Sequence, residues 1–503
     1  MPSDSLKKST ISAARWLMLR SLVGESLAIS SMLVLARLIS PAGFGHAAVA
    51  LVFSALAVVV TFEGFASVLV QRQVVENTQR STAVLLTLGA GLLMSAVLFA
   101  SATLVWRPLF GRATASLIAL VSPCFVVASV GAVSRASLWR ALDFRRLTKI
   151  EIGGRLGGEA TAVALAASGF GARSLVIGAI VASVLSSVML LAAAPPPWPR
   201  WHRREAGEIV GFGAPAALAG VIGQLFANVD YWILAARLNA YQTGIYYRAF
   251  NLGVAYQAKI SSVMMQLSFP VYSRLESREE MRRLHERVAR AHAMVIFPLL
   301  ALLAVLAPVL VPFLFGAVWR PAAGPAQIMA VGGMVAAILT GYPQVMRAVG
   351  DPQTLLRFDG AMMLLYAAAV TIAAAHGLLV VAGAVVGVYI LILIGAYRFL
   401  LGPHLGVSLR ALVQEMAPAI VGCIAVVSVC EPLQMALAPI LPPPLLLVLL
   451  IPAGLIAYAL TVRGLFGAAW RDLLALAAAA VPPLARFSSP AAAAASASVT
   501  APG

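Results

Sequence analysis

The segment RLESREEMRRLHERVARA (274–291) is followed directly by HAMVIFPLLALLAVLAPVLVPFLF (292–315), and this junction shows how the chain is built. The second stretch runs for 24 residues without an Asp, Glu, Lys or Arg, which is long enough to cross a bilayer as a helix. In the first stretch, Glu279–Arg283 and Glu286–Arg290 are spaced i,i+4, which predicts a solvated helix connecting two halves of the chain. A membrane span therefore follows a charged connector.

The same kind of apolar stretch recurs along the whole chain. Of its 503 residues, 61% are hydrophobic and only 11% are charged, with a mean hydropathy of +0.93. A soluble protein of this size has too little polar surface to cover so much apolar surface, so lipid must be the solvent. We predict an all-α polytopic membrane protein with about 14 transmembrane helices. The predicted spans are 16–36, 47–69, 82–105, 114–134, 151–169, 173–193, 209–235, 244–269, 292–315, 324–346, 358–375, 378–399, 412–430 and 443–462.

Basic residues in the predicted loops give the orientation. With the N-terminus inside, 26 of the 36 Lys and Arg residues lie in inside segments or at the adjoining span ends, and 6 lie in outside loops or at the adjoining span ends. This asymmetry is typical of cytoplasmic loops, so both termini are predicted to be cytoplasmic. The net charge of +17 has the same origin, and because the basic residues form no long run, the sequence does not predict nucleic-acid binding.

Two segments of the chain resemble each other. LARLISPAGFGHAAV (35–49) and AARLNAYQTGIYYRA (235–249) both contain Ala-Arg-Leu, followed by a glycine and a new span. The glycines are Gly45 and Gly244. Many transporters are built from duplicated halves, so this repeat favours a transporter.

Motifs of enzyme centres are missing from the sequence. It contains no G-x-S-x-G, no H-E-x-x-H and no Walker A loop, and its three cysteines and six histidines show no metal-ligand spacing. We therefore expect no enzymatic activity, no metal and no cofactor.

Charged residues inside the predicted spans are the candidates for a transport path. A charge at the bilayer centre costs roughly 2.5–3.5 kcal/mol, so such groups usually face water or a partner. Cations in a dehydrated lumen attract phosphate, arginine through a planar donor fork and lysine as a point charge, which predicts an anionic headgroup as ligand. The candidates are Arg20, Arg155, Arg248 and Lys259.

Structural roles remain open for these charges. Arg20 and Arg248 lie near span ends, where long side chains can reach the interface, and Arg155 is spaced to pair with Glu159 on one helix. Carboxylates in the spans either bind a coupling ion, H⁺ or Na⁺, or balance the arginines. They are Glu25, Glu63, Glu159 and Asp230.

Tyrosines cluster around the seventh and eighth spans. An aromatic belt at the membrane interface is the first interpretation, and stacking against sugar rings is the second. For the second, Tyr247 and Tyr256 are the candidates.

FGAPAALAGVIGQLFANVDYWILAARLNAYQTGIYYRAFNLG (212–253), SFPVYSRL (268–275) and LARLISPAGFG (35–45) resemble bacterial polysaccharide-repeat flippases. These are oligosaccharide flippases, colanic-acid type included, of the multidrug/oligosaccharidyl-lipid/polysaccharide exporter superfamily. The resemblance implies two six-helix lobes around a central cavity. The lobes would be residues 1–200 and 201–405, with two additional helices in 406–470 and a disordered cytoplasmic tail in 471–503.

The resemblance also implies a substrate. An undecaprenyl-diphosphate-linked oligosaccharide would be flipped across the bacterial inner membrane by alternating access, for exopolysaccharide, lipopolysaccharide or capsule biosynthesis. Cations of the first and eighth spans would hold the diphosphate, which points to Arg20, Arg248 and Lys259. The implied partners are the lipid-linked oligosaccharide, the bilayer, and a polymerase and chain-length regulator of the same pathway.

Three other functions remain open. A multidrug exporter of the same superfamily or a lipid II flippase would share the fold. A polysaccharide polymerase or ligase is disfavoured because such enzymes tend to carry a large periplasmic loop, and no predicted outside loop is long.

Overall fold

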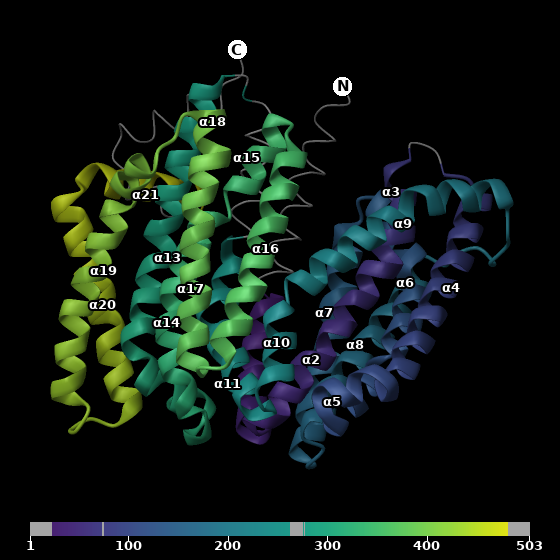
Figure 1. Ribbon diagram of the computed structural model, residues 1–503, viewed down its shortest axis with the longest axis horizontal. Coiled ribbons are helices and arrows are strands. Elements are labelled where there is room, and N and C mark those ends of the chain that lie inside the picture. Colours follow the sequence, from purple (N-terminus) through teal and green to yellow (C-terminus); the bar gives the residue numbers. More distant parts are fainter. Residues whose placement is uncertain (1–22, 73–74, 262–274, 276, 481–503) are drawn as a thin grey trace. The chain divides into compact units, whose positions relative to one another are not determined.

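Helices form both halves of the protein in a computed structural model, which describes residues 23–72, 75–261, 275 and 277–480 (Figure 1). The chain divides into two compact units, Met1–Tyr247 and Arg248–Gly503, called here unit 1 and unit 2. No strand occurs among the described residues. The predicted all-α fold is confirmed.

The first part of unit 1 that the structure describes is helical over residues 23–38. Its further helices are α2 (Pro41–Val58), η1 (Val59–Ala66), α3 (Ser67–Gln71), α4 (Asn77–Ser101), η2 (Ala102–Trp106), α5 (Arg107–Val121), α6 (Pro123–Arg140), α7 (Phe144–Ala167), α8 (Ala172–Ala193), α9 (Arg203–Phe226) and α10 (Val229–Arg237). Helix α11 (Ala240–Phe250) contains the division between the two units. The segments η1 and η2 are π-helical.

Unit 2 continues from the end of α11. Its helices are η3 (Asn251–Ala255), α13 (Arg278–Phe315), η4 (Ala317–Ala322), α14 (Ala323–Leu339), α15 (Tyr342–Val349), α16 (Pro352–Ala374), α17 (Leu378–Gly395), η5 (Ala396–Leu401), α18 (Gly402–Leu405), α19 (Leu409–Leu437), α20 (Pro443–Leu465) and α21 (Gly467–Ala480). The longest is α13, which joins most of the charged connector and the span after it into one 38-residue helix. At 1.5 Å per residue it is about 57 Å long, so it extends well beyond the hydrocarbon core.

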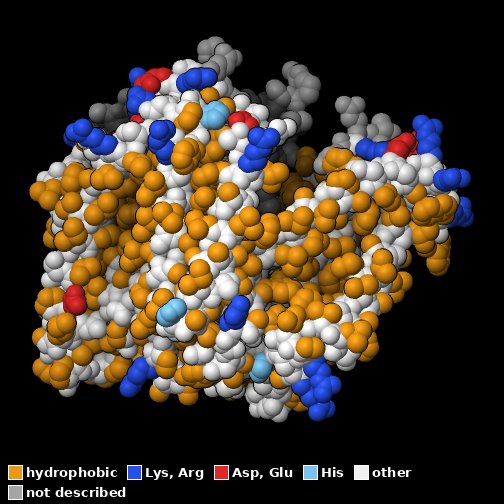
Figure 2. Space-filling view, viewed as in Figure 1, with side chains coloured by type: hydrophobic (Ala, Val, Ile, Leu, Met, Phe, Trp, Pro, Cys, Tyr) orange, Lys and Arg blue, Asp and Glu red, His pale blue; other side chains and the backbone are white. Residues whose placement is uncertain are grey.

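The flanks of both units carry hydrophobic side chains, and the Lys and Arg side chains gather mainly toward the helix ends (Figure 2). Ten helical stretches of the described residues are long and apolar enough to cross a membrane. This distribution is that of a protein solvated by lipid. The prediction of a multi-pass membrane protein is confirmed.

The ten stretches do not correspond one to one to the fourteen predicted spans. Every predicted span lies on helical residues wherever the chain is described, apart from short turns. Counting by length and composition merges neighbours, because Asn77–Arg140 is one stretch that contains two predicted spans. Helix α7, with six charged residues, is not among the ten. Fourteen spans therefore stays a prediction.

Domain boundaries at 200/201, 405/406 and 470/471 also stay predictions. The two units instead divide after Tyr247. In the segment predicted to be a disordered tail, residues 471–480 are helical and complete α21, and residues 481–503 lie outside the described part of the chain.

The two copies of the sequence repeat meet inside unit 1. Ser40 precedes α2 and accepts a hydrogen bond from the Gly43 amide at 3.2 Å, and Asn239 precedes α11 and accepts one from the Gln242 amide at 2.8 Å. The two helices therefore begin with the same kind of cap.

A reciprocal contact between Gly45 and Gly244 completes this arrangement. A Cβ on Gly45 would lie 1.9 Å from the carbonyl oxygen of Ala240, and a Cβ on Gly244 would lie 1.8 Å from that of Pro41. Only glycine allows backbones to approach so closely. The glycines that follow Ala-Arg-Leu in the two copies thus meet at a reciprocal helix crossing.

Candidate substrate-binding site

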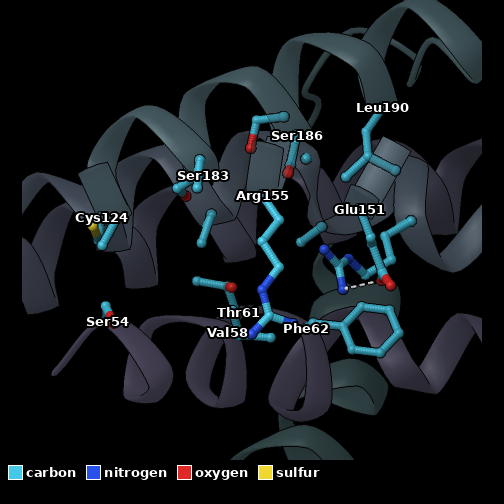
Figure 3. Close-up of a pocket in the computed structure, with 17 residues that line it drawn as sticks. Ser54, Val58, Thr61, Phe62, Cys124, Glu151, Arg155, Ser183, Ser186 and Leu190 are labelled. Atoms are coloured by element: carbon cyan, nitrogen blue, oxygen red, sulfur yellow. Dashed lines mark hydrogen bonds and ion pairs between the residues drawn. The ribbon is translucent and has the colours of Figure 1, made fainter. Parts of the chain in front are cut away.

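Unit 1 contains a cavity of about 250 Å³ between α2, η1, α6, α7 and α8 (Figure 3). Most of its wall is apolar or made of small residues. Its polar side chains are Ser54, Thr61, Arg135, Glu151, Arg155, Ser183, Ser186 and Ser187. Charges and hydroxyl groups among membrane-spanning helices usually mark a hydrated path or binding site. We therefore treat this cavity as the candidate site.

A glycine-rich crossing brings α7 and α8 together beside the cavity. A Cβ on Gly158 would lie 2.6 Å from the carbonyl oxygen of Gly178, and a Cβ on Gly178 would lie 2.7 Å from that of Gly158. Small residues at such a crossing let membrane helices pack closely. Because α7 is held there, Glu151 and Arg155 are presented to the cavity from a fixed helix.

Arg135 and Glu151 form one ion pair of the site. Their side chains come from α6 and α7, with Arg135 Nη1 3.1 Å from Glu151 Oε1, and they are 23% and 17% exposed. The guanidinium also lies 5.8 Å from the centre of the Phe62 ring. With most of its surface covered, this pair ties α6 to α7, and loss of one partner would leave the other charge poorly compensated.

Arg155 is the one predicted residue among the polar side chains of the cavity, and Arg135 is the arginine that the sequence did not predict there. The predicted span 114–134 ends just before it, so it was counted with the loop arginines. In the structure it belongs to α6 and lines the cavity. The available signal was the run of small residues at Ala128, Gly131 and Ala132, which at helical spacing share a face with Arg135.

Arg155 extends from α7 across the cavity toward η1, near Thr61, Val58 and Phe62 (Figure 3). Its ion-pair partner is Glu25, with Nη1 3.8 Å from Oε1 and side chains 37% and 32% exposed. The Arg155–Glu25 pair thus joins two helices, whereas the spacing in the sequence suggested a pair with Glu159 on the same helix. An ion pair this long and this exposed is weak, so an incoming anion can compete for the guanidinium.

The other carboxylates predicted to bind an ion or to balance charge lie apart from one another. Glu63 is exposed on η1, and Glu159 is half-buried on α7. Asp230, on α10, is buried and accepts a hydrogen bond from the Tyr246 hydroxyl at 2.8 Å. Neither Glu63, Glu159 nor Asp230 lines the cavity. Their roles in coupling stay predictions.

Arg248 has a very different environment in unit 2. Its side chain is fully buried, and the guanidinium carbon lies 4.6 Å from the centre of the Phe315 ring and 4.7 Å from that of Trp319. Both distances are typical of cation–π contacts. In this conformation the side chain has no surface to offer a headgroup.

The remaining predicted ligands are dispersed. Lys259 is half-buried, with its ammonium 5.3 Å from the centre of the Tyr256 ring. Tyr247 is half-buried, with its ring 5.4 Å from that of Tyr231 in unit 1. Arg20 lies outside the described residues. The roles of Lys259, Tyr256, Tyr247 and Arg20 in substrate binding stay predictions.

Residues 34–324, more than half of the chain, match the family model described as polysaccharide biosynthesis protein. The chain belongs to this family. The family assignment agrees with the resemblance found in the sequence.

Individual relatives support the same assignment. The lipopolysaccharide biosynthesis protein WzxC of Escherichia coli (strain K12) is 26% identical over 352 residues, which cover 69% of each chain. The teichuronic acid biosynthesis protein TuaB of Bacillus subtilis (strain 168) is 22% identical over 374 residues, 72% of this chain and 76% of TuaB. An uncharacterized membrane protein in the cps region of Klebsiella pneumoniae is 25% identical over 418 residues, 80% and 84% of the two chains.

Solved structures show the fold. The lipid II flippase MurJ, in an inward closed conformation, aligns with a TM-score of 0.68 and 14% identity over 90% of this chain and 98% of MurJ. An inward-facing multidrug resistance MATE family transporter of the MOP superfamily aligns with a TM-score of 0.55 and 13% identity over 80% and 98%. The family and the ten apolar helical stretches make the chain a membrane protein of polysaccharide biosynthesis, and its fold is similar to that of these two transporters.

Proposed function

We propose that the protein flips undecaprenyl-diphosphate-linked oligosaccharide repeat units from the cytoplasmic to the periplasmic leaflet of the bacterial inner membrane. Alternating access would carry out the step, and both termini would be cytoplasmic. The main support is the position of Arg155, which extends into a serine-lined cavity between membrane helices and pairs, within the described part of the chain, with the Glu25 carboxylate 3.8 Å away and 32% exposed. A guanidinium in such a place can exchange Glu25 for a diphosphate.

Two parts of the cavity would act on the headgroup differently. Arg155 would bind the diphosphate directly, and the hydroxyl groups of Ser183 and Ser186 would donate further hydrogen bonds. Arg135 would stay paired with Glu151 and hold α6 against α7. Arg20 and Lys259 remain candidates for contact at other stages of the cycle. Arg248 would take part only after leaving its aromatic neighbours.

An ion gradient would drive the cycle, with H⁺ or Na⁺ as the coupling ion. Glu25 would balance charge, because it faces the substrate-binding arginine and would be released when the diphosphate arrives. Asp230 is also suited to charge balance, because its carboxylate is buried and hydrogen-bonded to Tyr246. Glu63 and Glu159 are then the carboxylates left to bind the coupling ion. A polymerase and a chain-length regulator would receive the flipped unit.

Complementation tests this function against its alternatives. The chain is expressed in three strains: one lacking its polysaccharide flippase, one depleted of the lipid II flippase, and one sensitised to drugs by loss of its exporters. We expect surface polysaccharide to return in the first strain only. Growth of the second strain would identify a lipid II flippase, and drug resistance of the third would identify a multidrug exporter.

A further inference from the structure

Unit 1 carries an unusual loop between α8 and α9. Its sequence is APPPWPRWH (194–202), and α9 then begins with Arg203 and Arg204. The loop thus brings two tryptophans and three arginines together over a few residues, with no acidic residue before Glu205. We call residues 194–204 the Trp–Arg loop.

The backbone of the Trp–Arg loop is held in place by the first turns of α4. The Arg200 amide donates to the carbonyl oxygen of Ser81 at 3.4 Å, and the Thr82 hydroxyl donates to the carbonyl oxygen of Arg200 at 3.2 Å. The same hydroxyl lies 3.1 Å from His202 Nδ1. Four prolines restrict the chain further. The loop is therefore preorganised.

Its large side chains nevertheless point away from the protein. Trp198 is 84% exposed and Trp201 is 58% exposed. Arg200, Arg203 and Arg204 are exposed as well, and basic side chains gather at this end of unit 1 (Figure 2). Burial of a tryptophan ring is strongly favourable in free energy, and this free energy is lost when the ring is exposed to water. Two exposed indoles on a fixed backbone therefore indicate that something else covers them.

We propose that the Trp–Arg loop binds the headgroups of anionic lipids and anchors this end of unit 1 in the adjacent leaflet. The loop joins two membrane helices, so it must lie at the membrane–water interface, where the amphipathic indole ring is most stable. Arginines beside an anionic leaflet each add about a fivefold preference for it. With the proposed orientation this is the cytoplasmic leaflet. The inference goes beyond the proposed flipping and does not depend on it.

The test uses the full-length protein in nanodiscs of phosphatidylcholine and phosphatidylglycerol. One of the two lipids is brominated near the carbonyl end of its acyl chains, where bromine quenches indoles at the interface. The chain has eight tryptophans, so the signal of the loop is obtained by subtracting the emission of the Trp198→Phe/Trp201→Phe variant. We expect the loop tryptophans to be quenched by both lipids, and at lower mole fractions by phosphatidylglycerol.

Charge variants show whether the arginines cause this preference. In Arg200→Gln/Arg203→Gln/Arg204→Gln, the preference for phosphatidylglycerol should fall by about fivefold for each arginine removed. The matched control is Arg107→Gln/Arg112→Gln/Arg173→Gln, which removes three exposed arginines from the start of α5 and the start of α8, away from the loop that follows the end of α8. It should leave the preference of the loop unchanged.

Three results would overturn the proposal. Loop tryptophans that emit as in water, with no quenching, would show that no lipid covers them. Equal quenching by the two lipids, unaffected by the triple substitution, would show that the loop does not recognise anionic headgroups. Tryptophans that are shielded yet not quenched by either lipid would identify a protein surface, such as a second copy of the chain, as the partner.

Discussion

Arg155 in unit 1 and Arg248 in unit 2 show two ways of placing the same cation in a membrane protein. Arg155 lies in a cavity with hydroxyl groups and a carboxylate 3.8 Å away, and over a third of its side chain is exposed. Arg248 is fully buried between Phe315 and Trp319. The carboxylate and hydroxyl groups around Arg155 can be exchanged for a ligand. The aromatic faces around Arg248 belong to a packed core and cannot be exchanged without repacking. A charge within a span is therefore a candidate ligand only when its compensation can be replaced.

Arg248→Ala should have the largest effect on stability. It removes two cation–π contacts and leaves a cavity between the rings, so we expect a loss of about 2–4 kcal/mol in the free energy of unfolding. Thermal unfolding in detergent measures it, with a thiol-reactive dye reporting exposure of buried Cys124 and Cys430. Arg320→Ala, on the exposed surface of η4, is the control and should unfold like the wild type. A normal unfolding temperature for Arg248→Ala together with abolished transport would make Arg248 a ligand instead.

Arg155→Gln should give the opposite pattern. The loss of a charge-assisted contact with the diphosphate should lower transport by about 10- to 100-fold, while the unfolding temperature changes little. Flipping of a fluorescent undecaprenyl-diphosphate-linked sugar in proteoliposomes measures the first quantity. Arg155→Lys should retain part of the activity, and Arg173→Gln should retain all of it. Full transport by Arg155→Gln would show that Arg155 and its cavity are not needed for transport.

Gly24→Leu tests the position of Arg155 without changing its charge. A Cβ at residue 24 would lie only 3.0 Å from Arg155 Nη1, so a leucine must displace the guanidinium. We expect transport to fall about tenfold, because misplacement of a binding group by about an ångström is already costly. Gly89→Leu on α4, where a Cβ meets nothing within 4 Å, is the matched control. In an Arg155→Gln background, Gly24→Leu should cause no further loss, and an additive loss would contradict this reasoning.

Glu25→Gln should have the smallest effect. An exposed pair contributes up to about 1 kcal/mol, so removal of the carboxylate should raise the apparent affinity for substrate by about two- to fivefold. Transport at limiting substrate measures this gain. The comparison is Glu151→Gln, which breaks the closer and more buried pair with Arg135 and should lower transport. A strong loss of transport in Glu25→Gln, with unchanged binding of substrate, would show that Glu25 is the coupling residue.

The candidate site could be predicted only in part. A charge inside a span is visible in the sequence, which is why Arg155 and Arg248 were both selected. Their surroundings depend on which helices face each other, and no local pattern distinguishes the cavity of α7 and α8 from the aromatic pair of α13 and η4. Arg135 was missed because its position one residue beyond a predicted span made it look like a loop residue. The exposure of Trp198 and Trp201 was equally invisible, since tryptophan in a sequence does not show whether it is covered.

By itself, the sequence determined the all-α membrane fold, the order of the apolar helices and the family. These depend on the length and composition of single segments, because a helix in lipid satisfies its backbone hydrogen bonds internally. Tertiary structure alone decided that Glu25 faces Arg155, that Arg248 lies between two rings, and that the two copies of the repeat cross at Gly45 and Gly244. Those relations depend on the packing of helices far apart in the chain, where close approach and charge compensation are settled together.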